Sequence, residues 1–239
     1  MRNARRHEGK TRVTKFKELV MDTSQPGHEL GRFWASATGC SYVEPGTSDA
    51  TGDVIGRVDG EVEGMGIATC RVPEEKTVKH RVHLDVYADS VDSLTALGAL
   101  PASGYDTEHW TVLLDPEGGE FCAFLRDEPP AYRMFELIVD AVEPEQIARW
   151  WAEVIGVPVR NEGEPWWWLE DVPGTPFESI VFQPVPEPKT VKNRIHWDLY
   201  GNVDELLGRG ATVLADLPSS KVLADPEGNE FCVFPLSGG

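Results

Sequence analysis

The sequence has little positive charge, little cysteine and no long apolar run. Its 22 lysine and arginine residues face 40 aspartate and glutamate residues, so the net charge is −18. An acidic surface of this strength repels phosphate backbones, which argues against nucleic acid as a partner. No apolar run approaches the roughly 20 residues that a membrane-spanning helix needs, so we also expect no membrane partner.

The four cysteines, at positions 40, 70, 122 and 232, form no Cys-x-x-Cys pair. The sequence therefore lacks the usual local signal of a zinc site or a redox pair. The basic N-terminal stretch MRNARRHEGKTR has no apolar segment of the kind found in a signal peptide. We expect reduced thiols, a cytoplasmic location and a disordered tail over residues 1–12.

What the sequence does have is a long internal repeat. KTVKHRVHLD at 76–85 returns as KTVKNRIHWD at 189–198, and LLDPEGGEFCAF at 113–124 returns as LADPEGNEFCVF at 223–234. FKELVMD at 16–22 likewise parallels FELIVD at 135–140. A unit of this length is a domain rather than one turn of a solenoid. The prolines of RDEPPAY predict the boundary, with domains at 13–126 and 132–236 joined by a linker at 127–131.

Each half is predicted to contain two successive βαβββ-like modules, and side-chain alternation defines the faces of their strands. In RVHLDVY one face is apolar and would pack beneath helices. The opposite faces of this strand and of its repeat carry His83, Asp85 and Tyr87, and His196, Asp198 and Tyr200. Imidazoles and carboxyls in such a place must be solvated, paired or bound to a ligand. The pattern predicts a concave, ligand-facing surface.

The His-x-Asp pairs allow two interpretations. A neutral imidazole near carboxylates could act as a general base, which makes His83, Asp85, His196 and Asp198 catalytic candidates. Polar strand residues more commonly belong to an internal hydrogen-bond network, and we favour that interpretation. The sequence leaves both open.

The run of tryptophans at 166–168 is the most unusual local feature. Alternation places Trp166 and Trp168 on one face, where they could form an aromatic wall for a flat or cationic ligand, and Trp167 on the other. Core packing is the simpler explanation for at least one ring. The full set of predicted ligand-binding residues is Glu18, Tyr87, Glu120, Glu136, Trp166, Trp168, Tyr200 and Glu230.

The motifs FELIVD, ARWWAEVIG, PVPEPKTVKNRIHWDL and VLADPEGNEFCVF resemble the glyoxalase-like domains of the vicinal oxygen chelate superfamily, which has the glyoxalase and bleomycin-resistance fold. The resemblance covers about residues 13–236. It implies an α+β fold of two tandem domains, each a pair of βαβββ modules in a cupped mixed sheet with the helices outside. It predicts function less sharply, because the superfamily hosts many chemistries.

Metal-dependent members of this superfamily place four ligands in the cup, commonly His and Glu, one from each of four strands. In the first half, the four ligand positions of the family correspond to Glu18, Cys70, His83 and Cys122. In the second half they correspond to Glu136, Gln183, His196 and Cys232. Thiols stand where the family usually has glutamate, and an amide is a poor zinc ligand. The first-half set, with one oxygen, one nitrogen and two sulfur donors, suits tetrahedral zinc. The metal-ligand candidates in the two halves are Glu18, Cys70, His83, Cys122, Glu136 and His196.

These features favour a protein that binds a small organic molecule in its cups, such as a natural product or antibiotic, without a catalytic metal. The alternative is a lyase, isomerase or dioxygenase acting on a small oxygenated substrate, in which divalent zinc, iron, nickel or manganese serves as a Lewis acid. A structural module without catalysis is a third interpretation. We expect a monomer or homodimer, and the sequence does not indicate which half is functional.

Overall fold

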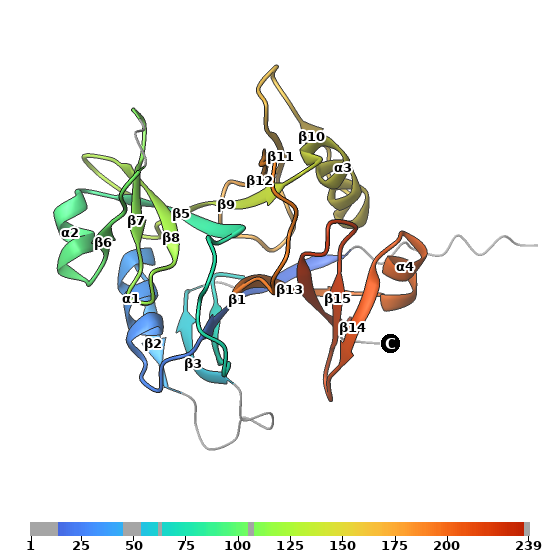
Figure 1. Ribbon diagram of the computed structural model, residues 1–239, viewed down its shortest axis with the longest axis horizontal. Coiled ribbons are helices and arrows are strands. Elements are labelled where there is room, and N and C mark those ends of the chain that lie inside the picture. The colour runs from blue at the N-terminus through green and yellow to red at the C-terminus, as the bar shows by residue number, and fades with distance from the viewer. Residues whose placement is uncertain (1–13, 45–53, 62–63, 105–107, 237–239) are drawn as a thin grey trace, which may run out of the picture.

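The computed structural model describes residues 14–44, 54–61, 64–104 and 108–236 (Figure 1). The tail expected to be disordered over residues 1–12 lies outside these ranges. None of the helices in the described part of the chain has the length and apolar character needed to cross a bilayer.

Four βαβββ-like modules follow one another along the chain. The first contains β1 (Lys15–Thr23), α1 (Glu29–Thr38), β2 (Ser41–Val43), β3 (Val54–Asp59) and β4 (Ile67–Arg71). The second contains β5 (Val82–Ala88), α2 (Val91–Ala96), β6 (Leu100–Pro101), β7 (Thr111–Leu114) and β8 (Glu120–Leu125). The third contains β9 (Met134–Ala141), α3 (Pro144–Ile155), β10 (Val159–Arg160), β11 (Trp167–Glu170) and β12 (Ser179–Pro184). The fourth contains β13 (Ile195–Gly201), α4 (Val203–Gly208), β14 (Thr212–Asp216), β15 (Lys221–Ala224) and β16 (Glu230–Pro235).

The strands form two eight-stranded mixed sheets. Sheet A has the order β14-β15-β16-β13-β1-β4-β3-β2, and sheet B has the order β10-β11-β12-β9-β5-β8-β7-β6. In Figure 1 the blue strand β1 lies beside the orange β13 at the centre of the molecule. The α+β fold with cupped sheets is confirmed.

The strand order also shows how the modules pair. The expected pairing within one half is not found: antiparallel contacts join β1 to β13 and β5 to β9, so each sheet takes one module from each half. The reason lies in two crossover loops. Residues 72–81 lead from β4 in sheet A to β5 in sheet B, and residues 185–194 lead back from β12 to β13. The chain therefore changes sheet between the modules of a half.

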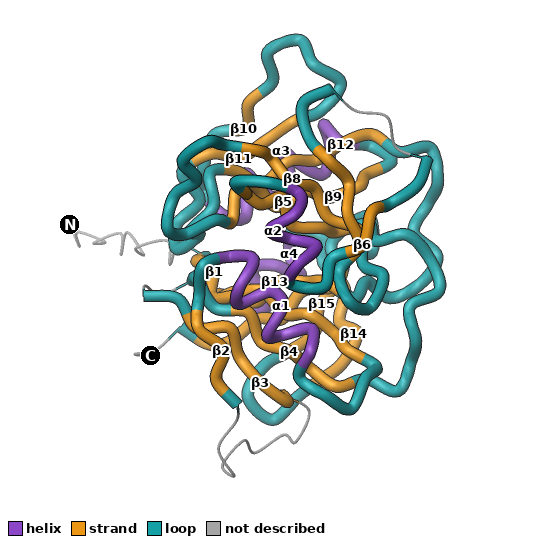
Figure 2. The backbone as a smooth tube through the Cα atoms, turned by 90° about the vertical axis from the view of Figure 1, so that its left-hand side faces the viewer, coloured by secondary structure: helices purple, strands orange, loops and turns teal. Residues whose placement is uncertain are grey.

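The long helices explain how the two modules of one half are held together. Leu30, Phe33, Trp34 and Ala37 recur at helical spacing along α1 and are buried. The helix ends at Gly39, whose φ of 76° is the left-handed conformation that glycine adopts without strain. Phe33 contacts Phe121 of β8 at a ring-centroid distance of 5.7 Å, so the helix of the first module packs on a strand of the second. Figure 2 shows α1 between the strands of the two sheets.

The repeated Asp-Pro-Glu-Gly turn anchors this core in both halves. The Asp225 carboxylate accepts hydrogen bonds from the backbone N–H groups of Glu227 and Asn229, both at 2.9 Å. Its second oxygen accepts from the indole N–H of the buried Trp151 at 3.1 Å. Asp115 repeats these contacts in the first half and accepts from Trp34 at 3.4 Å. The motif is thus a buried tie between a turn and a helix.

Replacement of Asp225 by alanine should lower the free energy of unfolding by about 2–4 kcal/mol, because several buried donors lose their acceptor. Urea denaturation followed by circular dichroism measures this loss. Glu128→Ala, at an exposed position, is the control and should change stability by less than about 0.5 kcal/mol. Equal stability of the two variants would show that the tie does not support the fold.

Candidate functional site

Strand register brings a histidine, an aspartate and a cysteine together on the polar face of each sheet. In sheet B, Asp85 of β5 lies opposite Cys122 of β8, and His83 precedes Asp85 by two residues on the same face. His83 Nε2 lies 3.5 Å from Asp85 Oδ1 and 3.7 Å from Cys122 Sγ. We call these residues the sheet B triad.

Sheet A contains the equivalent group from the second copy of the repeat. Asp198 of β13 lies opposite Cys232 of β16, and His196 Nε2 is 3.7 Å from Cys232 Sγ. The possible ligand atoms of this sheet A triad lie within 4.8 Å of one another, as they do in the sheet B triad. The structure thus brings the four predicted catalytic candidates into two triads.

Burial keeps both triads uncharged at the imidazole and the thiol. It lowers the pKa of His83 and of His196 to about 4, which leaves both rings neutral at pH 7. Burial likewise raises the pKa of the Cys122 and Cys232 thiols, so both remain protonated. Among the described residues, the Nδ1 atoms of both histidines have no hydrogen-bond partner. The network interpretation therefore accounts for only part of the polar surface.

The ligand set carried over for the first half is wrong as a group. Glu18 and Cys70 lie in sheet A, on β1 and β4, whereas His83 and Cys122 lie in sheet B. Likewise Glu136 lies in sheet B and cannot join His196 of the second-half set. Because the modules pair across the halves, each opening strand supplies its glutamate to the triad of the other half.

In sheet B this glutamate and the aspartate of the triad form an acid pair. Glu136 lies opposite Asp85 in the strand register and accepts a hydrogen bond from Ser179 at 2.5 Å. Burial, and then the charge of Glu136, raises the pKa of Asp85 well above its usual value. Burial also raises the pKa of Glu136 itself. The pair therefore holds a proton readily and would be stabilised in its charged form by a cation.

Aromatic rings lie beside this acid pair. The Phe135 ring is 4.5 Å from Tyr87 and 4.8 Å from Phe124, centroid to centroid. Trp110 stacks on Phe124 at 5.8 Å, and Tyr87 donates a hydrogen bond to Glu178 at 2.8 Å. The partly exposed cluster of Tyr87, Trp110, Phe124 and Phe135 is here called the sheet B aromatic cluster.

Sheet A holds a cation at the corresponding place. The Lys17 ammonium forms ion pairs with Glu18 and, at 3.3 Å, with Asp198, and it lies 4.3 Å from the centroid of the Phe234 ring. Arg57 forms a second ion pair with Glu18. In the second half of the repeat, Phe135 occupies the position that corresponds to Lys17. The two polar faces have therefore diverged, and sheet A is neutralised from within the chain.

The other predicted ligand-binding residues are distributed more widely. Glu120 and Glu230 bind Lys76 and Lys189 of the repeated loops, at 3.1 and 2.6 Å, away from the aromatic cluster. Tyr200 lies in sheet A, 6.4 Å from the Phe234 ring.

Trp167 and Trp168 point to opposite faces of β11, as predicted, whereas Trp166 precedes the strand. Trp168 pairs with Val181 in the register of β11 and β12, and its indole N–H donates to Glu170 at 2.7 Å. Trp167 packs against the core, whereas Trp166 remains 39% exposed. Trp168 therefore belongs to the face that also carries the acid pair.

Residues that sequence reasoning missed are Lys17, Arg57 and Ser179. Lys17 could have been noticed, because it interrupts an otherwise matching repeat with a charge where the other copy has phenylalanine. Arg57 and Ser179 carry no such signal, since their roles follow from strand register.

The triads fit a divalent metal by donor type and spacing. Ligands of a tetrahedral zinc ion with bonds of about 2.0–2.3 Å lie about 3.3–3.8 Å apart, and the sheet B triad has separations of 3.5 and 3.7 Å. Asp85 Oδ1, the atom that lies 3.5 Å from His83 Nε2, has no hydrogen-bond partner among the described residues and is free to act as a ligand. In sheet A the Lys17 ammonium beside Asp198 would oppose a second cation, so sheet B is the better metal site.

Comparison with known proteins gives a family and a fold. The model of the glyoxalase-like domain matches residues 18–124 and 136–234. A mutant of glyoxalase I from Zea mays superposes with a TM-score of 0.62 at 13% identity, covering 93% of this chain and 94% of the other. A proposed dioxygenase from Bacillus subtilis gives 0.63 at 12% identity, with 96% and 87% covered. No curated protein sequence matches the chain.

Lys17→Met should destabilise the protein by about 2–4 kcal/mol at pH 7, because Asp198 and Glu18 are buried and lose an ion-pair partner. Phe135→Met is the matched control in sheet B and should cost about 1 kcal/mol, since it removes no charge. Urea unfolding of the two variants gives the comparison. A loss below about 1 kcal/mol for Lys17→Met would mean that the ammonium does not neutralise this face.

Proposed function

Because the chain belongs to the glyoxalase-like domain family, we propose that the concave face of sheet B binds a flat organic molecule carrying a basic nitrogen. The observation that carries this proposal is the acid pair of Asp85 and Glu136 beside the sheet B aromatic cluster. A ligand ammonium would stabilise the ionised acids, and the rings would contact its flat body. A basic natural product or antibiotic has this chemistry.

Sheet A supplies an internal template for this mode of binding. There an ammonium group, that of Lys17, contacts Asp198, Glu18 and the ring of Phe234. Sheet B has the equivalent aspartate, glutamate and phenylalanine, namely Asp85, Glu136 and Phe124, but phenylalanine at the lysine position. We infer that the ligand brings the ammonium group that the chain provides in sheet A.

His83 gives the same face a group that can accept or donate a proton. Its neutral ring lies 3.5 Å from Asp85 Oδ1, and a bound molecule would meet both groups. A basic nitrogen near Asp85 would leave His83 to orient a hydroxyl or carbonyl of the ligand. Binding, rather than turnover, is the function that these contacts support best.

Tryptamine and indole-3-propionate carry similar rings with opposite charges and serve as the probe pair. We expect tryptamine to bind at least tenfold more tightly in isothermal titration calorimetry. Glu136→Gln should weaken tryptamine binding about five- to twentyfold, because a charged hydrogen-bond acceptor becomes neutral. Glu18→Gln, the matched change in sheet A, should leave the affinity unchanged. Preference for the propionate, or equal effects of the two variants, would overturn the proposal.

A second candidate function rests on the spacing of the sheet B triad. A zinc ion held by His83, Asp85 and Cys122 would polarise a substrate oxygen, as a lyase, isomerase or dioxygenase requires. The zinc ion would bind the Asp85 carboxylate, which the ammonium group of the proposed ligand also needs. The zinc ion and the basic ligand would therefore compete for Asp85.

Elemental analysis of tag-free protein purified under reductant distinguishes the candidates. A metalloenzyme should contain close to one zinc, iron, nickel or manganese per chain, lost in His83→Ala and retained in His196→Ala, because Lys17 neutralises sheet A. Protein that neither contains metal nor takes up added zinc would exclude this candidate. Loss of metal in His196→Ala alone would place the metal in sheet A and contradict the assignment to sheet B.

A further inference from the structure

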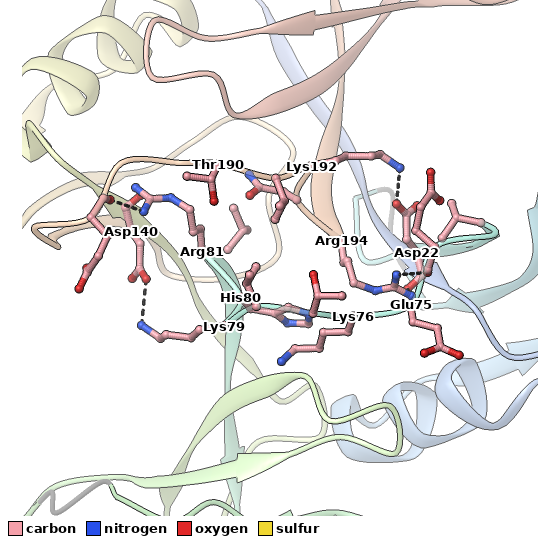
Figure 3. Close-up of a pocket in the computed structure, with 18 of the residues that line it drawn as sticks. Asp22, Glu75, Lys76, Lys79, His80, Arg81, Asp140, Thr190, Lys192 and Arg194 are labelled. Carbon is pink, nitrogen blue, oxygen red and sulfur yellow. Dashed lines mark hydrogen bonds and ion pairs between the residues drawn. The ribbon is translucent and has the colours of Figure 1, made fainter.

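The two copies of the repeated decapeptide face each other across a cavity of about 680 Å³ (Figure 3). Its walls come from the crossover loops at 72–81 and 185–194 and from the strand ends beside them. Neither triad lines this cavity. It is therefore separate from the concave faces discussed above.

Equivalent contacts hold the two ends of the cavity. Arg81 Nη1 donates to the backbone oxygen of Glu187 and Arg194 Nη1 to that of Glu74, both at 2.7 Å, so each loop is tied to the other. Lys79 forms an ion pair with Asp140 at 2.9 Å, and Lys192 forms one with Asp22. Figure 3 shows Lys79 and Arg81 at one end and Lys192 and Arg194 at the other.

One pair of neighbouring positions breaks this symmetry. In the second half, the Asn193 amide donates to Asn229 Oδ1 at 3.0 Å, and the Asn229 amide donates to Asp225 at 3.1 Å. The first half has His80 and Gly119 at these positions. His80 is only 8% exposed, yet neither ring nitrogen has a hydrogen-bond partner among the residues that the structure describes. An unpartnered buried imidazole at a cavity wall indicates a ligand contact.

The glycine is part of the same arrangement. A Cβ atom at position 119 would lie 2.5 Å from His80 Cε1, so any larger residue would displace the imidazole. The asparagine that closes the other end is thus incompatible with His80. The first half has histidine and glycine where the second half has an internally bonded asparagine pair, and this difference leaves a polar group at the cavity wall.

The walls are less acidic than the chain as a whole and carry apolar groups, so an anion with an apolar body meets less repulsion here. In a chain of net charge −18, they carry five basic residues, Lys76, Lys79, Arg81, Lys192 and Arg194, which balance the acidic residues lining the cavity. The side chains of Lys79 and Lys192 are 45% and 52% exposed, so their ammonium groups keep donors for a ligand. Val78 and Val191, which are 44% and 42% exposed, supply apolar contact.

We propose that the cavity is a second ligand site, which binds a small organic carboxylate through His80 and Lys76 with its apolar part against the valines of the two loops. Burial, and then the charge of Lys76, lowers the pKa of His80 to about 4. The ring is neutral at pH 7 and offers one N–H donor and one acceptor nitrogen, while the Lys76 ammonium, which is paired with Glu120 at 3.1 Å, retains further N–H donors for the ligand.

Octanoate and octylammonium, which share a chain length and differ in charge, are the probes for titration calorimetry on the full chain. His80→Asn/Gly119→Asn reproduces the asparagine pair of the second half and should fold, because that pair is already accommodated there. Val78→Asp places a negative charge on an exposed loop position of the cavity wall. Leu97→Asp, an equally exposed change on another element, is its control.

We expect octanoate to bind wild-type protein at least tenfold more tightly than octylammonium does. Binding should weaken at least tenfold in the double variant and in Val78→Asp, and stay unchanged in Leu97→Asp. In NMR spectra, octanoate should shift the ring signals of His80, assigned from the double variant, and leave those of His83 and His196 in place. Absence of octanoate binding, wild-type affinity in the two cavity variants, or shifts at His83 instead of His80 would overturn the proposal.

Discussion

Antiparallel pairing of β1 with β13 and of β5 with β9 is the contact on which the rest of the molecule depends. It closes each sheet from two halves of the chain and places the glutamate of each opening strand opposite a buried aspartate. Without it, Glu18 and Asp198 would not share Lys17, and Asp85 and Glu136 would not form an acid pair. The chemistry of both polar faces follows from this register, because neither half alone contains a complete set of groups.

The two faces answer the same electrostatic problem differently. Carboxyl groups removed from water require a proton, a cation or several donors. Sheet A uses a lysine and an arginine from its own strands, whereas sheet B retains the acids beside a cluster of aromatic rings. The exchange between lysine and phenylalanine, together with the presence of Arg57 in sheet A, separates a self-neutralised face from one suited to a ligand. The exchange at His80 and Asn193 shows the same kind of divergence at the crossover loops.

Sequence patterns predicted the elements well and their assembly poorly. Alternation in RVHLDVY and RIHWDLY correctly placed His83 with Asp85 and His196 with Asp198, because side-chain direction along a strand is a local property. The tie between Trp34 and Asp115 joins residues far apart in the chain, and no local rule relates them. The ligand set of Glu18, Cys70, His83 and Cys122 failed for the same reason, since it assumed that a half of the sequence is also a sheet.

The crossover loops have a consequence for how such a chain could arise and how it can be divided. A single half would have both of its central strands, β1 and β5, as uncovered sheet edges, which readily pair with other strands. Two copies of one half could satisfy each other by the pairing seen here, with β1 of one copy beside β5 of its twin, in a closed twofold dimer. In the fused chain this association is intramolecular, so each first half is always paired with one second half. The sequences of the two halves can therefore differ. The two polar faces of this protein can therefore differ, whereas those of a dimer of identical halves would be the same.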